Sequence, residues 1–445
     1  MFFRFTCGVW LLSLGLLPAA PALAQQAPII ADSLNLEGTV RAALEANPAI
    51  TTLEEQVNAS AARVAQSRTG LLPQITGTAT YTYLNPVAKA AFPAGPGGEV
   101  RELQFVPNHN YDTHITAQYL LLDFGRNNAT INLAESQRQT AQDNIVVTRR
   151  DLAFSAAQVY YGILFLRESI KVQNEQIASL QARQRELEKR VQGGVSTNFD
   201  VTTVKVRVAQ AENARIDLQN QLRNQQVQLA RLLHRPEYYE VPVRGTFAYQ
   251  PQAVDAQAAL ARATENRPEI KLARDAENTA NLQLRLTEKS NLPTLGTGVQ
   301  VGGKNGYQPD INKFRANLTG VVQLSVPIYD GNKNRNQRVE ALAGVRGAQA
   351  RTKDTQEQIR ADVQQAVNNL DASAARYDNS LVQITQATDA LTRAKARYRY
   401  DVGTNLDVLD AETSLAQARL ARLQAIYTYT LGQYQLRRAT GEQIW

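Results

Sequence analysis

The sequence predicts a mainly α-helical protein that carries a smaller membrane β part and is built from two copies of one unit. Three observations support this fold class. The two halves of the chain repeat each other, each half holds one long run without proline, and each half holds two segments in which apolar and polar residues alternate. Alternation with a period of two indicates strands, whereas the long runs indicate helices with narrow apolar stripes. We therefore expect long, coiled-coil-like helices and four strands in each chain.

The internal repeat is clearest in two segments that lie 207 positions apart. The sequence STNFDV at 196–201 recurs as GTNLDV at 403–408, and NPAI at 47–50 recurs as RPEI at 267–270 with the larger spacing of 220. The larger spacing before the strands places the longer loop in the first repeat, at Phe92–Gly98. This stretch is rich in proline and glycine and is not expected to continue a helix or strand. We divide the chain into a first repeat (25–236), a linker (237–252) and a second repeat (253–445).

The first 24 residues predict a secretory signal peptide. Arg4 precedes an apolar run, and Ala22-Leu23-Ala24 supplies the small residues of a cleavage site. A buried N-terminal helix is the alternative. Cys7 lies inside this segment, so the mature chain contains no cysteine and forms no disulfide. No later apolar run is long enough for a transmembrane helix. Any part that enters a membrane is therefore expected to do so with strands.

The four predicted strands span about 74–84, 112–123, 294–303 and 314–326. Each has one apolar and one polar face, and their lengths are close to the 9–11 or so residues of a tilted strand that crosses a bilayer. In lipid every backbone group must be paired, so such a sheet has to close on itself. One chain cannot close it, and we expect three chains to form a twelve-stranded barrel with an open lumen. A small soluble β-sandwich is the alternative.

The long helical runs are expected over about 127–190 and 335–400. At 1.5 Å per residue each is a rod of roughly 95 Å. Each has two shorter companions, at about 48–68 and 201–233 in the first repeat, which we expect to stack end to end beside the rod. Amphipathic turns near Leu36–Glu45 and Val254–Glu265, the linker and the C-terminal Gly441–Trp445 are expected to form a girdle at mid-length.

Each long run ends in a reversal between antiparallel helices, at about 191–200 and 400–410. An acid follows each reversal in the first turn of the next helix, where the helix dipole favours negative charge: Asp200 in one copy and Asp407 in the other. Asp410 lies on the same helix face as Asp407 because the two are three residues apart. For all three acids, a role as a helix cap is the alternative to a functional role.

These features resemble TolC-type outer-membrane efflux proteins over about Leu34–Gln443. The resemblance is carried by Leu-Pro before each odd strand, by Asp123-Phe124-Gly125 and Tyr329-Asp330-Gly331 after each even strand, and above all by YDVGT at 400–404 followed by DVLDA at 407–411. It implies a trimeric barrel joined to a helical periplasmic tunnel in the outer membrane. It further implies an exit duct of tripartite pumps or type I secretion systems, which docks to a periplasmic adaptor protein and an inner-membrane transporter.

The resemblance also implies roles for residues at the two reversals. Asp407 and Asp410 match acids that form rings in the lumen at the periplasmic entrance, and Asp200 and Tyr400 match a hydrogen-bonded pair that holds the entrance closed. Asn405 stands about where the family has an arginine, in a reversal that is two residues shorter, so the charged part of this latch is altered. The adaptor-contacting residues are expected at Gly194, Val195, Ser196, Thr197, Val402, Gly403 and Thr404.

The sequence does not predict catalysis. His109, His114 and His234 lack companions at metal-ligand spacing, Gly302-Gly303-Lys304 lacks the spacing of a phosphate loop, and no catalytic constellation stands out. The net charge of +7 is spread along helices, which argues against nucleic acid. We expect an export channel without enzyme activity, cofactor or metal. A periplasmic coiled-coil scaffold or adaptor is the alternative, and an adhesin of the autotransporter kind is disfavoured because the strands are too few.

Overall fold

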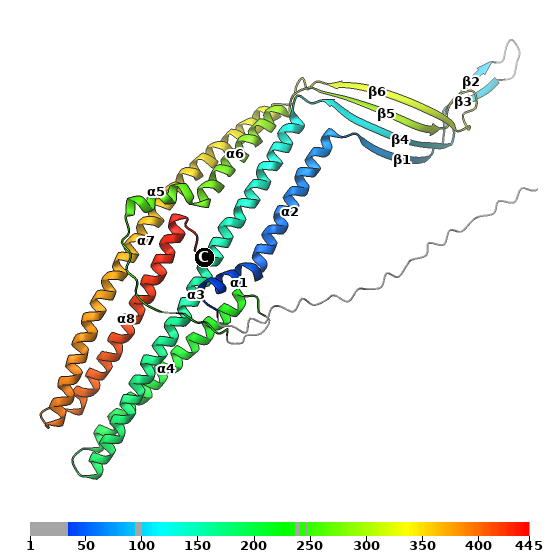
Figure 1. Cartoon of the computed structure of the whole chain (residues 1–445). Helices are drawn as coiled ribbons and strands as arrows, with labels where there is room; N and C mark the ends of the chain where they lie inside the picture. The colour runs from blue at the N-terminus through cyan, green and yellow to red at the C-terminus, as the bar shows by residue number, and fades with distance from the viewer. Residues whose placement is uncertain (1–33, 94–99, 236–240, 246, 445) are drawn as a thin grey trace, which may run out of the picture.

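The computed structural model describes residues 34–93, 100–235, 241–245 and 247–444. The molecule is elongated: a β-sheet forms one end, and two helical hairpins reach the other end (Figure 1). The predicted fold class is confirmed, because the described chain is mainly helical and carries one four-stranded sheet. The predicted signal peptide (1–24) lies outside the described residues, as do 237–240 and 246 of the predicted linker.

Each repeat contributes one long helix and two shorter helices that pack along it. Helices α2 and α4 both pack on α3, and helices α6 and α8 both pack on α7. Figure 1 shows α2 and α4 one above the other along α3, the stacking expected for the two short helices. Helix α3 also packs against α6 and α8, which joins the two repeats side by side. The bounds are Pro48–Arg68 (α2), Arg126–Gln192 (α3), Asn198–Leu232 (α4), Pro268–Lys289 (α6), Lys333–Arg399 (α7) and Asn405–Thr440 (α8).

Two short helices, α1 (Leu36–Ala46) and α5 (Ala256–Asn266), lie at mid-length against α3 and α7 (Figure 1). Each begins with a capping side chain. The carboxamide oxygen of Asn35 accepts a hydrogen bond from the Gly38 N–H, and the carboxylate of Asp255 accepts one from the Gln257 N–H. These helices close the two larger apolar clusters of the core, so the best-buried part of the molecule is its middle.

The sheet has the order β1-β4-β5-β6, and every neighbouring pair is antiparallel. Strands β4 and β5 come from different repeats and pair directly, with Ile115 opposite Val301. The structure thus joins the strands of both repeats into one sheet. Ile75, Leu318 and Leu324 remain exposed on one face. The bounds are Gln74–Tyr83 (β1), His109–Leu122 (β4), Thr294–Lys304 (β5) and Arg315–Ser325 (β6).

A second hairpin corrects the expectation for the long loop of the first repeat. Strands β2 (Lys89–Pro93) and β3 (Val100–Gln104) pair antiparallel beyond the outer end of the main sheet (Figure 1). Phe92 and Pro93 were expected to interrupt regular structure, yet they end β2. Proline is tolerated there because it closes a two-stranded ribbon, in which its missing N–H breaks no central ladder. Residues 94–99 lie outside the described part.

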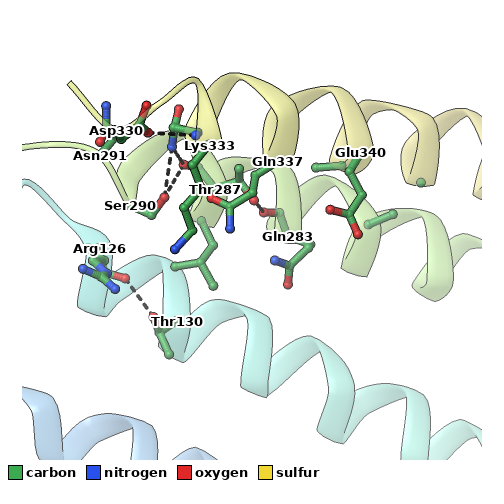
Figure 2. Close-up of a pocket in the computed structure, with 15 residues that line it drawn as sticks. Arg126, Thr130, Gln283, Thr287, Ser290, Asn291, Asp330, Lys333, Gln337 and Glu340 are labelled. Carbon is green, nitrogen blue, oxygen red and sulfur yellow. Dashed lines mark hydrogen bonds between the residues drawn. The ribbon is translucent and has the colours of Figure 1, made fainter.

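The sheet joins the long helices through one repeated device, which we call the elbow. In the second repeat, the Asp330 carboxylate accepts a hydrogen bond of 2.8 Å from the Asn334 N–H in the first turn of α7. The Asn334 side chain in turn donates 3.0 Å to the Thr287 carbonyl, at the end of α6. Figure 2 shows Asp330, Thr287 and Ser290 gathered at this junction. The device fixes where a strand ends and a helix begins.

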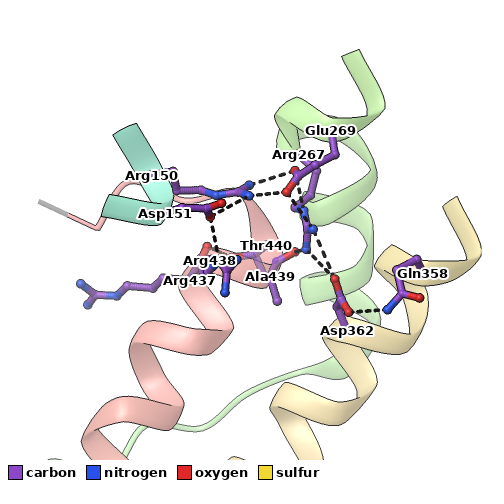
Figure 3. Close-up of polar contacts among 10 residues, drawn as sticks. All are labelled: Arg150, Asp151, Arg267, Glu269, Gln358, Asp362, Arg437, Arg438, Ala439 and Thr440. Carbon is purple, nitrogen blue, oxygen red and sulfur yellow. Dashed lines mark hydrogen bonds and ion pairs between the residues drawn. The ribbon is translucent and has the colours of Figure 1, made fainter. Parts of the chain in front are cut away.

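A buried ionic network joins the two repeats at mid-length (Figure 3). Arg150 of α3 and Arg267 both donate to the carboxylate of Glu269, and Arg267 also pairs with Asp362 of α7 at 3.3 Å. Burial alone would raise the pKa of Glu269, but the hydrogen bonds and charges of the two arginines lower it to about 2. The carboxylate therefore stays ionised and ties the repeats together at neutral pH.

Candidate functional site: the paired helical tips

The two reversals lie beside each other at the end remote from the sheet, and we call them the α3–α4 tip (193–197) and the α7–α8 tip (400–404). Both have the same backbone. Gly194 and Asp401, which are 207 positions apart, both take a left-handed conformation, with φ of +74° and +56°. After each, an N–H reaches back to the last turn of the long helix: Val195 to the Arg190 carbonyl and Val402 to the Arg397 carbonyl.

The second tip turns at an aspartate and not at its glycine. The left-handed residue is Asp401, and aspartate tolerates this conformation better than most residues. Gly403 has a different reason to be glycine. A Cβ atom at this position would lie 2.9 Å from the Arg397 Cβ, so any side chain would push the tip away from α7.

Each tip is closed by a capping box. The Thr197 hydroxyl accepts from the Asp200 N–H, and the Asp200 carboxylate accepts from the Thr197 N–H at 3.3 Å. Thr404 and Asp407 repeat this arrangement, with 2.9 Å between the Thr404 nitrogen and the Asp407 carboxylate. The alternative considered for these acids, a role as helix caps, is therefore present in both copies.

Hydrogen bonds of the caps lower the pKa of both acids. Partial burial raises the pKa of Asp200, but hydrogen bonds from Thr197, Ser196 and Asn405 outweigh it and bring the pKa below its usual value. The pKa of Asp407 is lowered mainly by the backbone N–H and then by the hydroxyl of Thr404, with a smaller effect of the Arg397 charge. Both groups are therefore carboxylates at neutral pH.

Arginines of α3 hold the α7–α8 tip against the first hairpin. The Arg183 guanidinium lies 4.0 Å from the centre of the Tyr398 ring, and its Nε donates 3.1 Å to the buried Asn405 side chain. Arg190 lies 4.8 Å from the same ring and pairs with Asp401 at 3.2 Å. We call this cluster the clasp. Only 8% of the Arg183 side chain is exposed, so the attraction between cation and ring is little weakened by water.

Further polar contacts continue the clasp along the two hairpins. Arg207 of α4 pairs with Asp410 at 3.1 Å. Glu412, which is buried, accepts from the Ser179 hydroxyl at 2.9 Å and pairs with Lys395 at 3.2 Å. Near the tips, the two hairpins thus meet through charged and polar side chains and also through a smaller apolar cluster that includes Leu187, Val204 and Leu409.

The structure arranges the expected latch residues differently from the resemblance. Asp200 is engaged in its cap, and in the described part of the chain no hydrogen bond joins it to Tyr400, whose exposed fraction is 76%. Asn405 does take part in a charged contact, because Arg183 supplies the guanidinium from the other hairpin. Sequence reasoning missed Arg183, Arg190 and Tyr398. The spacing of Arg183 and Arg190, seven residues apart on one helix face, was the only available signal.

Both tips expose apolar side chains at equivalent positions. Val195 and Val402 have exposed fractions of 67% and 66%, and Phe199 and Leu406 are likewise exposed one turn later. The expected contact residues Gly194 and Thr197 are exposed beside them on the first tip, as is Thr404 on the second, whereas Ser196 and Gly403 are partly covered. Apolar groups at the end of a polar rod are a surface that another protein can cover.

At the opposite end, the four-stranded sheet presents apolar side chains to the outside, and among the described residues no helix is both long and apolar enough to cross a membrane. The fold thus combines a membrane-facing sheet with long paired hairpins, which defines a class of outer-membrane channel proteins with a helical periplasmic part. A family model described as "Outer membrane efflux protein" matches residues 39–234 and 259–442. The chain belongs to this family.

Named relatives agree with this assignment. The outer membrane protein TolC of Escherichia coli is 24% identical over 429 residues, which cover 92% of this chain and 82% of TolC. Among solved structures, a membrane protein from Pseudomonas aeruginosa has a TM-score of 0.77 at 20% identity, with 92% of this chain and 90% of the other covered. The CmeC outer membrane channel of Campylobacter jejuni has a TM-score of 0.76 at 17% identity, with 91% and 85% covered.

The chain is therefore an outer-membrane efflux channel, with its sheet in the membrane and its helices in the periplasm. It is a transport protein and not an enzyme. The prediction of an export channel is confirmed, and the alternative of a periplasmic scaffold without a pore is excluded by membership of the family.

Proposed function

We propose that three copies of this chain form one export duct, whose three sheets close into a twelve-stranded barrel. The order β1-β4-β5-β6 leaves β1 and β6 as the two edges of the described sheet. An open edge cannot stay unpaired in lipid, so β6 of one copy pairs with β1 of the next. The polar face, with Thr76, Gln118 and Gln323, then lines the lumen, and the apolar face meets lipid.

The entrance of this duct lies at the tips, and Asp407 and Asp410 form its selective ring. Both are exposed on the first turns of α8 and follow the reversal directly. The cap occupies one oxygen of Asp407, Oδ2, and leaves Oδ1 free for ions, while Asp410 shares its charge with Arg207. Three copies bring six carboxylates to one axis, where they attract cations and repel anions.

The tips also dock a periplasmic adaptor, which links the duct to an inner-membrane transporter that provides the energy. The exposed pair Val195 and Val402, with the neighbouring Gly194, Ser196, Thr197, Gly403 and Thr404, forms two equivalent contact surfaces on each chain. Three chains would offer six such surfaces in a ring, matched to a partner that binds them through apolar side chains. The duct itself needs no cofactor or metal.

The proposed selective ring rests on one observation, the pair of exposed acids directly after the α7–α8 tip. Planar-bilayer conductance tests this proposal. The purified mature protein is compared with Asp407→Asn/Asp410→Asn. We expect a small, cation-selective conductance that divalent cations block, and a block weakened at least about tenfold in the double variant because the ring loses its charge. The matched control is Asp371→Asn/Asp389→Asn, which removes two exposed acids from α7.

Each other outcome has a definite meaning. A conductance and a divalent block that are unchanged in the double variant would leave the channel in place but reduce Asp407 and Asp410 to helix caps. A folded protein that never conducts would contradict the proposed duct. If the control weakened the divalent block equally, the effect would come from a general loss of surface charge and not from a ring of acids at the entrance.

A further inference from the structure

The elbows place one basic residue at the start of each long helix. Arg126 is the first residue of α3 and Lys333 the first of α7, and they are equivalent positions of the repeat, 207 residues apart. A positive charge is disfavoured at this end of a helix, because the helix dipole is itself positive there. A basic residue nevertheless occupies the first position of both helices, so local helix stability does not explain its presence.

Neither cation is neutralised by a group among the described residues. In the described part of the chain, the Arg126 guanidinium and the Lys333 ammonium have no hydrogen-bond acceptor and no ion pair. Lys289, the last residue of α6, and Arg335, in the first turn of α7, are exposed and equally unpaired there. The acids that precede the two helices, Asp123 and Asp330, each accept a backbone N–H with their carboxylate, from Asn127 and Asn334. The junction therefore holds several positive charges without partners.

A groove of about 830 Å³ runs between α3, α6 and α7 at this junction, and Arg126 and Lys333 reach it from opposite walls. Thr130, Thr287 and Ser290 add hydroxyl groups to its lining. Figure 2 shows Arg126, Lys333 and Ser290 at the end of the groove that is nearest the strands, and the second acid, Glu340, further along α7. The charged end of the groove is thus the end closest to the membrane.

Exposed apolar side chains surround the same junction. Ile328 and Tyr329, immediately before the elbow of the second repeat, have exposed fractions of 94% and 83%. In the elbow of the first repeat, Asp123 accepts from the Asn127 N–H, and Leu122 and Phe124 on either side of Asp123 are also exposed. These side chains continue the apolar face of the sheet down to the level of the cations. Apolar groups next to unpaired basic groups are the pattern of a surface at the boundary between acyl chains and headgroups.

We propose that this groove binds a phospholipid of the membrane leaflet that faces the periplasm. The lipid phosphate lies between Arg126 and Lys333, and the acyl chains follow Ile328 and Tyr329 along the sheet. Arginine and lysine are the side chains that phosphate oxygens prefer, and the nearby apolar belt favours a lipid over a free phosphate ion. The proposal rests on the outer-membrane location, not on the gate or the adaptor.

Native mass spectrometry of the full-length mature protein tests the proposal, with dihexanoyl phosphatidylglycerol as the probe. The variant is Arg126→Gln/Lys333→Gln. Each basic group near an anionic lipid surface contributes about 1 kcal/mol, so the variant should bind the probe roughly thirtyfold more weakly. The matched control is Arg138→Gln/Lys353→Gln, which removes one exposed charge from each of the same helices farther from the sheet. The control should bind the lipid like the unmodified protein.

Thermal unfolding and oligomeric state show whether the variant is folded, and its conductance should be unchanged because the groove is remote from the tips.

Lipid binding that is equal in the variant and the unmodified protein would overturn the proposal. So would binding of inorganic phosphate as strong as that of the lipid, which would indicate a plain anion site. Cross-links from a cysteine at Ser290 to a second copy of the chain, without lipid binding, would show instead that a neighbouring subunit fills the groove.

Discussion

At the scale of single residues, Arg183 is a buried side chain of the contact between the two hairpins. A buried guanidinium is stable only when its charge is compensated, and here the Tyr398 ring, the Asn405 oxygen and Glu186 share that role. Its Nη2 has no partner in the described structure, although it is buried. An incompletely satisfied buried charge suits a contact that must open, because separation of the hairpins returns the guanidinium to water.

Replacing Arg183 by glutamine should favour separation of the two tips. The lost contact with the ring and with Asn405 is worth about 1–2 kcal/mol, or roughly a tenfold rise in the population of separated tips. We expect the resting conductance in planar bilayers to rise accordingly. Lys171→Gln is the control, because Lys171 is exposed and its one ion pair among the described residues is with Glu168 of its own helix. A resting conductance identical to that of the unmodified protein would show that the clasp does not hold the tips together.

At the scale of elements, the contact between α3 and α6 contains a pair of carboxyl groups that cannot both ionise freely. Asp143 and Asp275 lie against Lys271, which pairs with Asp143 at 2.8 Å. Burial and the neighbouring Asp143 raise the pKa of Asp275 to about 6, whereas hydrogen bonds from Lys271 and Gln139 outweigh burial and lower the pKa of Asp143. The helices therefore pack best when Asp275 carries the proton of the pair.

This pair predicts a stability that depends on pH. The pKa of Asp275 is higher in the folded state than its ordinary value of 3.8, so its contribution is complete below about pH 4 and is lost as the pH rises through 6. Asp275→Asn imitates the protonated form. It should leave the unfolding temperature unchanged at pH 4 and raise it at pH 8, by the equivalent of about 1–2 kcal/mol.

Thermal unfolding of the detergent-solubilised protein at several pH values measures this difference. The control, Asp217→Asn, changes an exposed acid of α4 and should have the same small effect at every pH. If Asp275→Asn shifted the unfolding temperature equally at pH 4 and pH 8, the shared proton would be refuted.

At the scale of the whole molecule, duplication places equivalent groups at both ends of the rod. The elbows repeat the Asp–Asn clamp next to the membrane, and the tips repeat a capping box and an exposed valine at the far end. The ionic network around Glu269 and the apolar clusters hold the middle. The two larger apolar clusters at mid-length, and a smaller one with charged contacts near the tips, suit a duct that stays anchored in the membrane while its entrance responds to a partner.

Val195→Asp/Val402→Asp should separate partner binding from channel formation. An aspartate on each tip places charge where an apolar contact is proposed, and burying that charge would cost several kcal/mol. The adaptor should therefore bind at least about a hundredfold more weakly, and adaptor-dependent efflux in cells should fall. Oligomeric state and conductance of the purified protein should not change. Thr202→Asp, which adds a charge to an exposed position one turn into α4, is the control. Retained efflux in the valine variant would move the docking surface elsewhere.

Much of this architecture could be predicted from the sequence, because it depends on local patterns. Period-two alternation indicated the four strands of the main sheet, long proline-free runs indicated α3 and α7, and the repeated STNFDV and GTNLDV segments indicated two equivalent tips. These features arise from the conformational preferences of residues that are close together in the sequence. The β2–β3 hairpin was missed because its strands are short and proline ends one of them.

Only the tertiary structure decided which distant groups meet. The β4–β5 pairing joins residues from different repeats, and Arg183 meets Asn405 across 222 positions of sequence. The clasp forms because α3 carries Arg183 and Arg190 to the side of α7, a consequence of how two whole hairpins pack. Helix and strand periods determine which face of an element is buried, but the partner on that face is selected by packing of all the elements together, and no local pattern in the sequence encodes it.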